Sequence, residues 1–299
     1  MKYKRSFASV VVDTMNYMIL GIFTLLCFFP FYYLFINSIS DNTLSSNGLI
    51  LFWPKGVHFE NYIKVMQIRG LGQATLVSLA RTAIGTASNV LCSGFLAYAI
   101  TKKELFARKF CYRFVLVTMY LNAGIIPWYM NMKMLGLTDN FLAYVIGVIS
   151  PFSLILFKTY VESLPASLEE SAQIDGAGYI TIFFKIIAPL SLPIIATLAV
   201  FTAVWQWNSF IDTLFLMNDS KYYTLQYVLY RYLMEVQSIA RAMQQASQSG
   251  GGFVAPPRQL NATSIRMTLT MVVVFPVLLV YPFFQRYFVK GIMIGAVKG

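Results

Sequence analysis

The sequence predicts an all-α integral membrane protein, and three observations support this fold class. Hydrophobic residues make up 58% of the 299-residue chain and charged residues only 12%, about half of their share in soluble domains. The apolar residues form long runs, each of which is long enough to cross a bilayer. The net charge of +11 is concentrated at the ends of these runs, as the excess of Lys and Arg in cytoplasmic loops predicts, and does not indicate nucleic-acid binding.

Six stretches reach the length of about 20 residues that a bilayer core requires. They cover residues 16–38, 73–100, 110–131, 140–160, 187–212 and 265–288. The second has the weakest apolar character, because it carries Arg81 and several hydroxyl and amide side chains, and its small residues suit a helix that packs against other helices. The first has no small-residue cleavage site after it, so we expect a retained helix rather than a signal peptide.

Lys and Arg residues predict the orientation of these spans. The loop after the third span has only Lys133. Basic residues gather instead in the N-terminal tail (Lys2, Lys4, Arg5), in the 101–113 loop (Lys102, Lys103, Arg108, Lys109, Arg113) and in the C-terminal tail (Arg286, Lys290, Lys298). We therefore expect both termini in the cytoplasm, which agrees with an even number of spans. Residues 162–193 then lie in the cytoplasm, and residues 39–72 and 213–264 lie outside.

No internal repeat and no second soluble domain is visible, so residues 1–299 are expected to form a single transmembrane domain. Two features stand out in the outer 213–264 segment. YYTLQYVLYRYLMEV predicts an amphipathic helix. The stretch QQASQSGGGFVAPPRQ that follows is rich in Gly, Pro and Ser, which predicts a mobile loop.

The sequence contains no catalytic motif. There is no G-x-x-x-x-G-K-[ST] loop, so we expect this chain not to hydrolyse ATP. The cysteines Cys27, Cys92 and Cys111 lie in or at the edge of apolar runs without a CxxC pair, which predicts buried free thiols. The single histidine, His58, lies in a loop and cannot form a zinc site alone. We therefore expect no catalytic residue, no metal site and no cofactor in this chain.

Residues 162–193 read ESLPASLEESAQIDGAGYITIFFKIIAPLSLP, which is polar for a connection between two spans. Ser167 and Glu170 fit the S-x-x-E capping box that begins a helix. Gly176 can end this helix in the left-handed C-cap conformation. A second helix is predicted to begin near Tyr179 and to run into the fifth span. These local features alone leave open whether the segment is a docking surface or an ordinary interfacial loop.

Arg81 is the first candidate for a solute path, because an intramembrane charge is unfavourable and usually marks a functional site. The alternative is that Arg81 extends to the outer interface or pairs with Asp212 at the outer end of the fifth span. Either arrangement would give the guanidinium a structural role.

Further candidates for the path combine aromatic faces with hydrogen-bonding groups, which suit sugar rings. Trp205, Trp207 and Asn208 lie together in the fifth span, beside Asp212. Their alternative role is in the aromatic belt at the membrane interface. Tyr129 and Asn122 in the third span are weaker candidates, for which hydrogen bonding between helices is the alternative.

The polar segment also resembles a known motif. LEESAQIDGAGYITIFFKIIAPLSLP is similar to the EAA motif of ABC importer permeases, which is roughly E-A-A-x-x-D-G-A followed after a spacer by I-x-L-P. The matching residues are Glu170, Ala172, Asp175, Gly176, Ala177, Ile187 and Pro189. Ser171 replaces the middle Ala of the motif, and Ala188 replaces the Leu before the proline.

The resemblance covers nearly the whole chain. FWPKGVHFENY is similar to the outer loop after the first span of sugar permeases, and WQWNSFIDTLF matches their W-x-W-N pattern. QRYFVKGIMIGAVKG resembles the C-terminal tail of the carbohydrate subfamily related to the maltose importer. The resemblance therefore implies the six-helix type I ABC importer permease fold.

The resemblance also implies a role for residues 162–193 as coupling helices that enter a cleft of a cytoplasmic ATPase. Glu170 would pair with a basic group of that ATPase, and Gly176 would permit the turn. The implied coupling residues are Glu169, Glu170, Ser171, Ala172, Asp175, Gly176, Ala177 and Gly178.

The complex that the resemblance implies lies in the bacterial cytoplasmic membrane. It contains a second homologous permease, an extracytoplasmic solute-binding protein and two ATP-binding cassette subunits, which hold ATP and Mg. It would import an oligosaccharide by alternating access. Arg81 and the likeness to a branch with pectin- and alginate-type importers favour an acidic one.

Three alternatives stay open. The first is an ABC permease for a neutral sugar or another small solute. The second is a stand-alone secondary transporter, which would usually show inverted repeats and broken helices, neither of which is visible in the sequence. The third is an integral-membrane enzyme.

Overall fold

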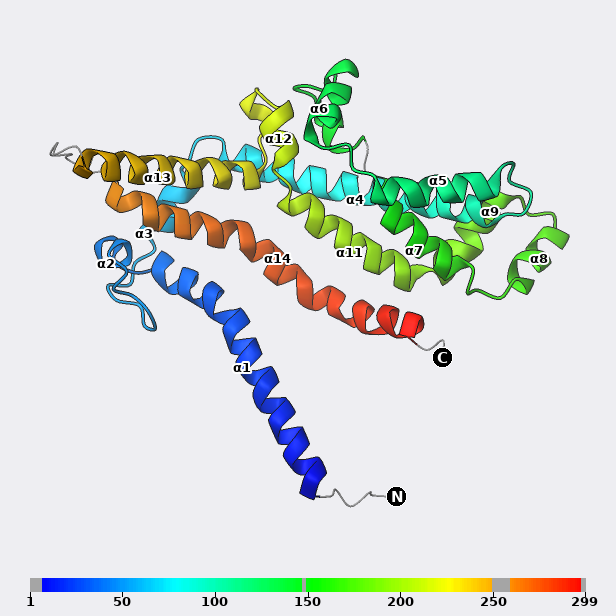
Figure 1. Cartoon of the computed structure of the whole chain (residues 1–299), viewed down its shortest axis with the longest axis horizontal. Coiled ribbons are helices and arrows are strands. Elements are labelled where there is room, and N and C mark those ends of the chain that lie inside the picture. Colours follow the sequence, from blue (N-terminus) through cyan, green and yellow to red (C-terminus); the bar gives the residue numbers. More distant parts are fainter. Residues whose placement is uncertain (1–6, 147–148, 249–258, 297–299) are drawn as a thin grey trace. The chain divides into compact units, whose positions relative to one another are not determined.

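The computed structural model describes residues 7–146, 149–248 and 259–296 (Figure 1). Every regular element in these ranges is a helix, which confirms the all-α prediction. The chain divides into two compact units. The first unit comprises residues 1–68 and 231–275, and the second comprises residues 69–230 and 276–299.

The first unit begins with the 32-residue helix α1 (Phe7–Ser38), followed by the short helices α2 (Asn42–Ser46) and α3 (Glu60–Met66). It also contains the C-terminal part of α13 (Leu225–Gln248) and the N-terminal part of α14 (Gln259–Ala296). The body of α1 is apolar: the most apolar 18-residue window within Ser9–Ser38 has a mean hydropathy of 2.2, and only 6% of that window is buried within the chain. Such a helix suits contact with lipid or with other membrane helices.

Buried polar side chains fix the end of α1 to the loop that follows it. The Asn37 amide nitrogen donates to the Ile50 carbonyl at 3.3 Å, and the Asn37 amide oxygen accepts from the Ser45 hydroxyl at 2.9 Å. The Asn61 amide donates to the Ser38 carbonyl at 3.2 Å. Because buried polar groups need hydrogen-bond partners, these contacts define one arrangement of the loop.

The second unit contains the elements that form the candidate site. They are α4 (Leu71–Thr101), α5 (Arg108–Tyr120), α6 (Ile125–Met134), η1 (Phe141–Tyr144), α7 (Pro151–Val161), α8 (Ser167–Ile174), α9 (Tyr179–Ile182), the π-helical turn η2 (Phe183–Ile187), α10 (Ala188–Leu190), α11 (Leu192–Asn208), α12 (Ile211–Leu216) and η3 (Ser220–Tyr222). The first residues of α13 and the last part of α14 also belong to this unit.

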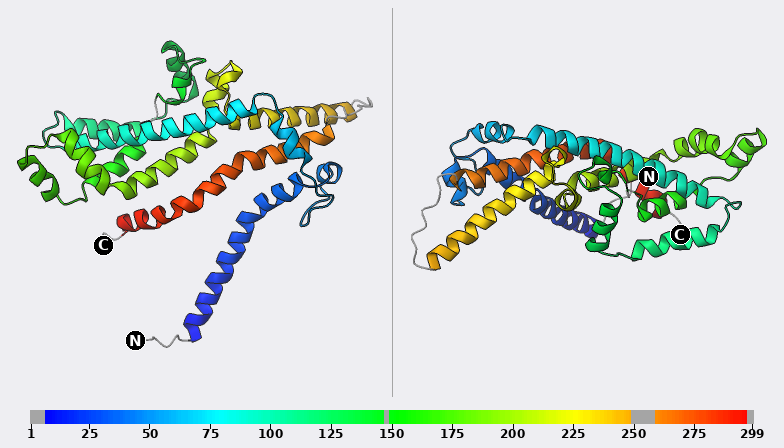
Figure 2. Two further views of the ribbon diagram at one scale, coloured as in Figure 1. Left: turned by 180° about the vertical axis from the view of Figure 1, so that it is seen from behind. Right: turned by 90° about the horizontal axis from the view of Figure 1, so that it is seen from above.

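Helix α4 lies beside α7 and α11, as Figures 1 and 2 both show. The core between them contains Ala97, Phe157, Phe183 and Leu198, all of which are buried. A Cβ atom at Gly94 of α4 would lie 3.2 Å from Cε2 of Phe157 of α7. The small residues of the second predicted span therefore allow neighbouring helices to approach closely, as expected from the sequence.

The structure differs from the six continuous spans that the sequence predicts. Within the described residues, three helical stretches are long and apolar enough to cross a membrane, namely Ser9–Ser38, Leu71–Thr101 and Thr263–Val280. The third predicted span is two helices, bent by 119° between α5 and α6, and the fifth contains α10, α11 and the start of α12, with a bend of 82° between α10 and α11. The fourth, expected over 140–160, contains the short turn η1 and the 11-residue helix α7. Counting each bent pair as one span gives up to five.

Each break has a local cause. Between α5 and α6, the Asn122 side chain accepts the Gly124 amide at 2.9 Å, and Gly124 has a φ of 85°. Such a side-chain-to-backbone bond competes with the helical bonding pattern. Between α10 and α11, Ser191 is the last residue before a helix whose second residue is Pro193. Proline has no amide hydrogen to continue the ladder of the preceding helix.

Two further expectations need correction. The three cysteines are free thiols, but Cys27 and Cys92 are exposed and Cys111 is half-buried within this chain, since they lie on outward-facing sides of their helices. The predicted outer helix is present as α13, but it continues to Gln248 and so includes the start of the expected mobile loop. The central part of that loop, residues 249–258, lies outside the described residues, as does the tail residue Lys298.

Candidate functional site

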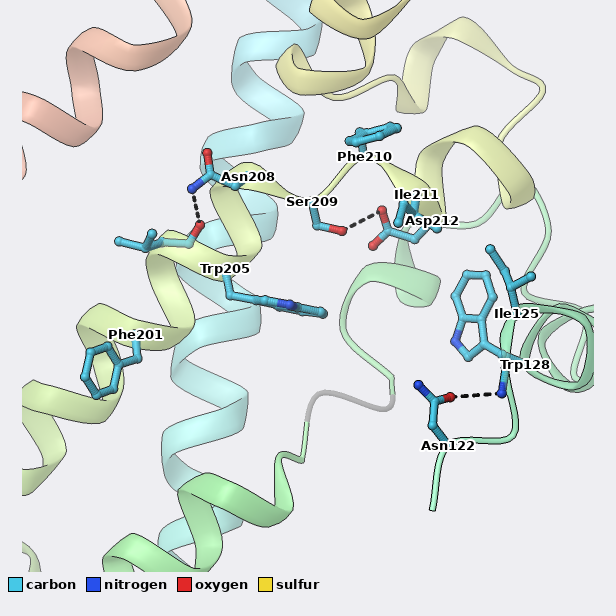
Figure 3. Close-up of a pocket in the computed structure, with 12 residues that line it drawn as sticks. Asn122, Ile125, Trp128, Phe201, Trp205, Asn208, Ser209, Phe210, Ile211 and Asp212 are labelled. Atoms are coloured by element: carbon cyan, nitrogen blue, oxygen red, sulfur yellow. Dashed lines mark hydrogen bonds between the residues drawn. The ribbon is translucent and has the colours of Figure 1, made fainter. Parts of the chain in front are cut away.

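A cavity of about 770 Å³ opens where α6, α11 and α12 of the second unit meet (Figure 3). Its walls are mostly apolar and aromatic, with amide and hydroxyl groups between them. The lining residues are Asn122, Gly124, Ile125, Trp128, Phe201, Val204, Trp205, Asn208, Ser209, Phe210, Ile211 and Asp212. A pocket with apolar walls and a few polar groups is typical of a site for a small ligand.

Two indole rings dominate this cavity. Trp205 extends from α11 towards the side on which Trp128 and Asn122 lie (Figure 3), and 60% of its surface is exposed. Phe210 stacks on Tyr230 with ring centroids 4.7 Å apart. Of these aromatic walls, Phe210 is therefore held in place by stacking, and the Trp205 ring faces open space.

Amide side chains supply the polar groups. The Asn208 amide nitrogen donates to the Val204 carbonyl at 2.9 Å, and its oxygen accepts from Gln226 at 3.1 Å. The Asn122 oxygen accepts the Gly124 amide, whereas its nitrogen has no hydrogen-bond partner in the part of the chain that the structure describes. Asn122 can therefore donate to a solute in the cavity.

A second cavity, of about 410 Å³, adjoins the first. It shares Phe201 and Trp205 with the first cavity, and its other walls come from α4, α7 and the residues before α7. The remaining lining residues are Asn89, Ile149, Ser150, Phe152, Ser153 and Thr202. The two cavities together form a track of aromatic faces and small polar groups along α11.

Arg81 of α4 is 1% exposed and does not line either cavity. Its Nε donates to the Gln206 oxygen at 2.8 Å, and one terminal nitrogen donates to the Ser209 carbonyl at 3.2 Å and to Oδ1 of Asp212 at 2.9 Å. The other terminal nitrogen pairs with Oδ2 of Asp212. The guanidinium also lies over the Tyr144 ring, 4.6 Å from its centroid. Four hydrogen bonds and the Tyr144 ring therefore occupy the guanidinium. Little of its hydrogen-bonding capacity is available to a solute.

The network around this ion pair extends through the second unit. The Tyr144 hydroxyl donates to the Tyr222 carbonyl at 2.7 Å and lies 2.9 Å from the Thr213 hydroxyl. A Cβ atom at Gly85 would lie only 2.3 Å from Nε2 of Gln206. A Cβ atom at position 85 would therefore displace the Gln206 side chain from the place where it accepts from Arg81.

An acidic side chain joins two loops near the first cavity. Oδ1 of Asp139 accepts the backbone amides of Asn218 and Asp219 at 2.6 and 2.8 Å, and Oδ2 accepts the Asn218 side chain at 3.1 Å. The Asp219 amide is the largest cause of a lowered pKa of Asp139, followed by the two bonds from Asn218. In its charged form, the Asp139 carboxylate therefore holds the loop after α12 in place.

The structure separates the predicted path residues into two groups. Trp205, Asn208, Asp212 and Asn122 line the first cavity. Arg81 and Trp207 are buried away from it, and Tyr129 packs against the cluster around Met132 and Leu216.

Sequence analysis missed Trp128, Phe201 and Phe210, which also line the cavity. Trp128 and Tyr129 lie in the same apolar run, and a helix read continuously through residues 110–131 does not show which of them faces the site. The break before α6 resets the helical register, so the direction of Trp128 depends on it.

The polar 162–193 segment folds into a helix, a turn and a second helix, as predicted. Helix α8 ends in a Schellman motif, in which the Gly176 amide donates to the Gln173 carbonyl at 3.0 Å and the Ala177 amide to the Ala172 carbonyl at 2.9 Å. Gly176 has a φ of 80°, which a residue with a Cβ atom adopts at a cost. The start differs from the predicted capping box, because Ser167 already lies inside the helix and Ala166 is the N-cap residue.

The two glutamates of α8 have different surroundings. Glu169 accepts from the Tyr98 hydroxyl at 2.8 Å and pairs with Lys102 at the end of α4. The Lys102 ammonium also lies 4.0 Å from the centroid of the Tyr98 ring. Glu170 is exposed and has no hydrogen-bond or ion-pair partner among the described residues. Glu169 therefore fixes α8 to α4, and Glu170 is available to another protein.

The remaining predicted coupling residues form the tip of the segment. Ala172 is buried in the core, and Ala177 packs against it. Ser171, Asp175, Gly176 and Gly178 are exposed. Ile174 beside them is 87% exposed. A small, exposed tip with one projecting aliphatic side chain suits insertion into a cleft of a partner.

Comparison with known proteins assigns the chain to one family. The family model described as "Binding-protein-dependent transport system inner membrane component" matches residues 1–294. The chain is 36% identical over 290 residues to the polygalacturonan/rhamnogalacturonan transport system permease protein YtcP of Bacillus subtilis, with 96% of this chain and 98% of YtcP covered.

Two further similarities are more distant in sequence. The chain is 26% identical over 281 residues to the arabinooligosaccharides transport system permease protein AraQ of Halalkalibacterium halodurans, with 91% of each chain covered. Among solved structures, it is similar to a chain of a bacterial ABC transporter involved in the import of the acidic polysaccharide alginate. That match has a TM-score of 0.82 and 27% identity, and covers 96% of this chain and 100% of the other.

Proposed function

The chain belongs to the family of binding-protein-dependent transport system inner membrane components, and from this premise we propose that it is a permease subunit of an ATP-driven oligosaccharide importer. YtcP and AraQ are named as permeases for polygalacturonan/rhamnogalacturonan and for arabinooligosaccharides, which supports an oligosaccharide as the solute. The proposal adds ATP-driven alternating access, a place in the bacterial cytoplasmic membrane and, for the solute, an acidic oligosaccharide.

The observation that carries the proposal is the aromatic cavity in the second unit. Trp205 and Trp128 present indole faces, and Asn122 has an amide donor to spare. Sugar rings combine apolar CH faces with hydroxyl groups, so stacking and directional hydrogen bonds recognise both parts. The adjoining second cavity gives room for more than one sugar ring.

The acidic character of the solute is supported by the relatives and not by Arg81. YtcP is named for polygalacturonan and rhamnogalacturonan, and the structural relative for alginate. These names indicate uronate-containing chains. Arg81 does not support an acidic solute, because it lines neither cavity and is paired with Asp212.

Coupling to ATP hydrolysis is proposed for the tip of the 162–193 segment. The exposed residues Glu170, Ile174 and Asp175 would enter a cleft of a cytoplasmic ATP-binding cassette subunit. Glu169 and the Schellman motif would transmit its movement to α4 and to the helices that lead into α11. A second permease, two ATPase subunits and an extracytoplasmic solute-binding protein complete the proposed complex.

The test is sugar-stimulated ATPase activity and uptake by the whole complex, with its binding protein, in lipid vesicles. The panel contains oligogalacturonides, alginate oligosaccharides and neutral arabino-oligosaccharides. Stimulation by an acidic oligosaccharide supports the full proposal. Stimulation by the neutral series alone would keep the importer and overturn the acidic solute, and the absence of an associated ATPase would overturn the coupling role of residues 162–193.

A further inference from the structure

A basic cavity of about 570 Å³ lies at the start of α5, outside the two cavities described above. Its lining residues are Lys103, Ala107, Arg108, Lys109, Phe110 and Arg113. Four of these six residues are cations, and none is acidic. The cavity therefore has the charge of a site for an anion.

Three of the four cations have no partner of their own. Lys103, Lys109 and Arg113 are exposed and make no hydrogen bond or ion pair among the described residues. Arg108 differs, because its Nε donates to the Ile100 carbonyl at 2.9 Å and its terminal nitrogen lies 3.6 Å from Glu162. That carboxylate is also bonded to Lys158 at 2.7 Å, so it compensates the cluster only in part.

The helix itself indicates that a counter-charge is missing. Lys109 and Arg113 are four residues apart on α5 and so lie on the same face, where like charges destabilise a helix. An anion bound between them would remove this repulsion.

An apolar stripe begins at the same cavity. Phe110 lines the cavity and stacks on Phe114, with ring centroids 6.3 Å apart. Val117 continues the stripe along α5, and Leu121 follows at its end; all four side chains are at least half exposed. No residue of α5 is buried within the chain. The stripe therefore presents hydrocarbon directly beside the cations.

From this combination we infer that the cavity binds the phosphate headgroup of an anionic phospholipid, whose acyl chains follow the stripe from Phe110 to Leu121. Lys103, Lys109 and Arg113 hold the phosphate. Phe106, which is 92% exposed, precedes α5 in the chain and would lie at the membrane interface. A soluble phosphate would use the cations but would leave the apolar stripe without a role, which is why we assign a lipid. The inference does not depend on the solute that is transported.

The site predicts selective loss of bound lipid in defined variants. The whole complex is purified in mild detergent with added phosphatidylglycerol, and lipid that stays bound is counted by native mass spectrometry. Each cation near a membrane surface contributes about a fivefold factor in affinity. Lys109→Gln alone should therefore weaken retention about fivefold, and K103Q/K109Q/R113Q should abolish it.

Matched variants separate the possible sources of an effect. Lys133→Gln removes an exposed cation from another loop and should leave retention unchanged. Phe114→Ser should weaken lipid retention but not the binding of inorganic phosphate, measured by competition with a fluorescent phosphate analogue. Equal losses in the triple variant and in Lys133→Gln would show a general effect of charge and overturn the site.

Two other outcomes also overturn the inference. If Phe114→Ser retains lipid like the unchanged complex, or if inorganic phosphate displaces the lipid completely, the cavity is a soluble-anion site. Should the triple variant fail to assemble, the single variants Lys109→Gln and Arg113→Gln provide the same comparison.

Discussion

The buried ion pair between Arg81 and Asp212 gives the sharpest prediction for this fold. Asp212→Asn leaves the arginine charged in a site where its side chain is 1% exposed. Removing one partner of a buried pair typically destabilises a protein by 3–5 kcal/mol. Arg81 keeps its bonds to Gln206 and to the Ser209 carbonyl, so we expect a loss near the lower end, about 3 kcal/mol. At roughly 2 °C per kcal/mol, the thermal midpoint should fall by about 6 °C.

The double variant R81M/D212N tests the reasoning. It removes both charges, and the acceptors that lose a donor are the buried Gln206 oxygen and the part-buried Ser209 carbonyl, so we expect a net loss of about 1 kcal/mol. Stability therefore recovers by about 2 kcal/mol relative to Asp212→Asn, and Arg81→Met alone completes the double-mutant cycle that measures the coupling between the two charges. The assay is a thermal unfolding scan of the purified complex in lipid nanodiscs. A single variant that unfolds within about 1 °C of the unchanged protein, or a double variant less stable than Asp212→Asn, would refute a charge-driven network.

Three further predictions concern the turn at Gly176, the cavity lined by Trp205 and the loop held by Asp139. Gly176→Val forces a φ of 80° on a β-branched residue and should uncouple ATP hydrolysis from uptake in vesicles. Gly178→Ala, at a φ of −74° with open space around its Cβ position, should not; retained coupling in both variants contradicts the proposed role of the turn. Trp205→Ala should raise the KM of oligosaccharide uptake about tenfold, on the scale of one lost stacking contact, and Trp205→Phe should restore most of it; an unchanged KM in the alanine variant removes Trp205 from the path. Asp139 has a lowered pKa, so its stabilisation of the loop is complete above the unfolded value of about 3.9 and disappears as the pH falls through the lower folded value. Asp139→Asn at pH 7 should therefore increase hydrogen exchange in residues 217–220, and acid should have the same effect on the unchanged protein. Equal exchange in the two proteins at pH 7 would contradict this role of Asp139.

The parts of the fold that depend on local pattern could be predicted from the sequence. The apolar runs located α1 and α4, and the glycine after α8 located the turn at Gly176, because each signal lies within a few residues of the structure that it determines. The breaks inside the third and fifth predicted spans could not be predicted in the same way. A hydropathy window averages over Asn122 and Ser191, although these residues end helices through single side-chain or proline effects.

The site illustrates the same limit at longer range. Arg81 and Asp212 are 131 residues apart in sequence, and their pairing was one of two structural alternatives that the sequence allowed. The pairing depends on the packing of α4 beside α11, which a single sequence does not reveal. Glu169 and Glu170 are adjacent and chemically identical, and only the position of Lys102 shows that one faces inward.

Because Arg81 is already paired with Asp212, the charge of an acidic solute has to be recognised elsewhere in the complex. Among the residues that the structure describes, Asp212 is the only ionisable one that lines the two cavities, and it is already paired. A uronate carboxylate that entered this space would lose water without gaining a cation from the described part of this chain, which is unfavourable. If the solute is acidic, we therefore expect this subunit to hold the sugar faces, and the second permease or the binding protein to supply the cations. R81M/D212N should then keep the preference of the complex for acidic over neutral oligosaccharides, and loss of that preference in the double variant would return Arg81 to the solute path.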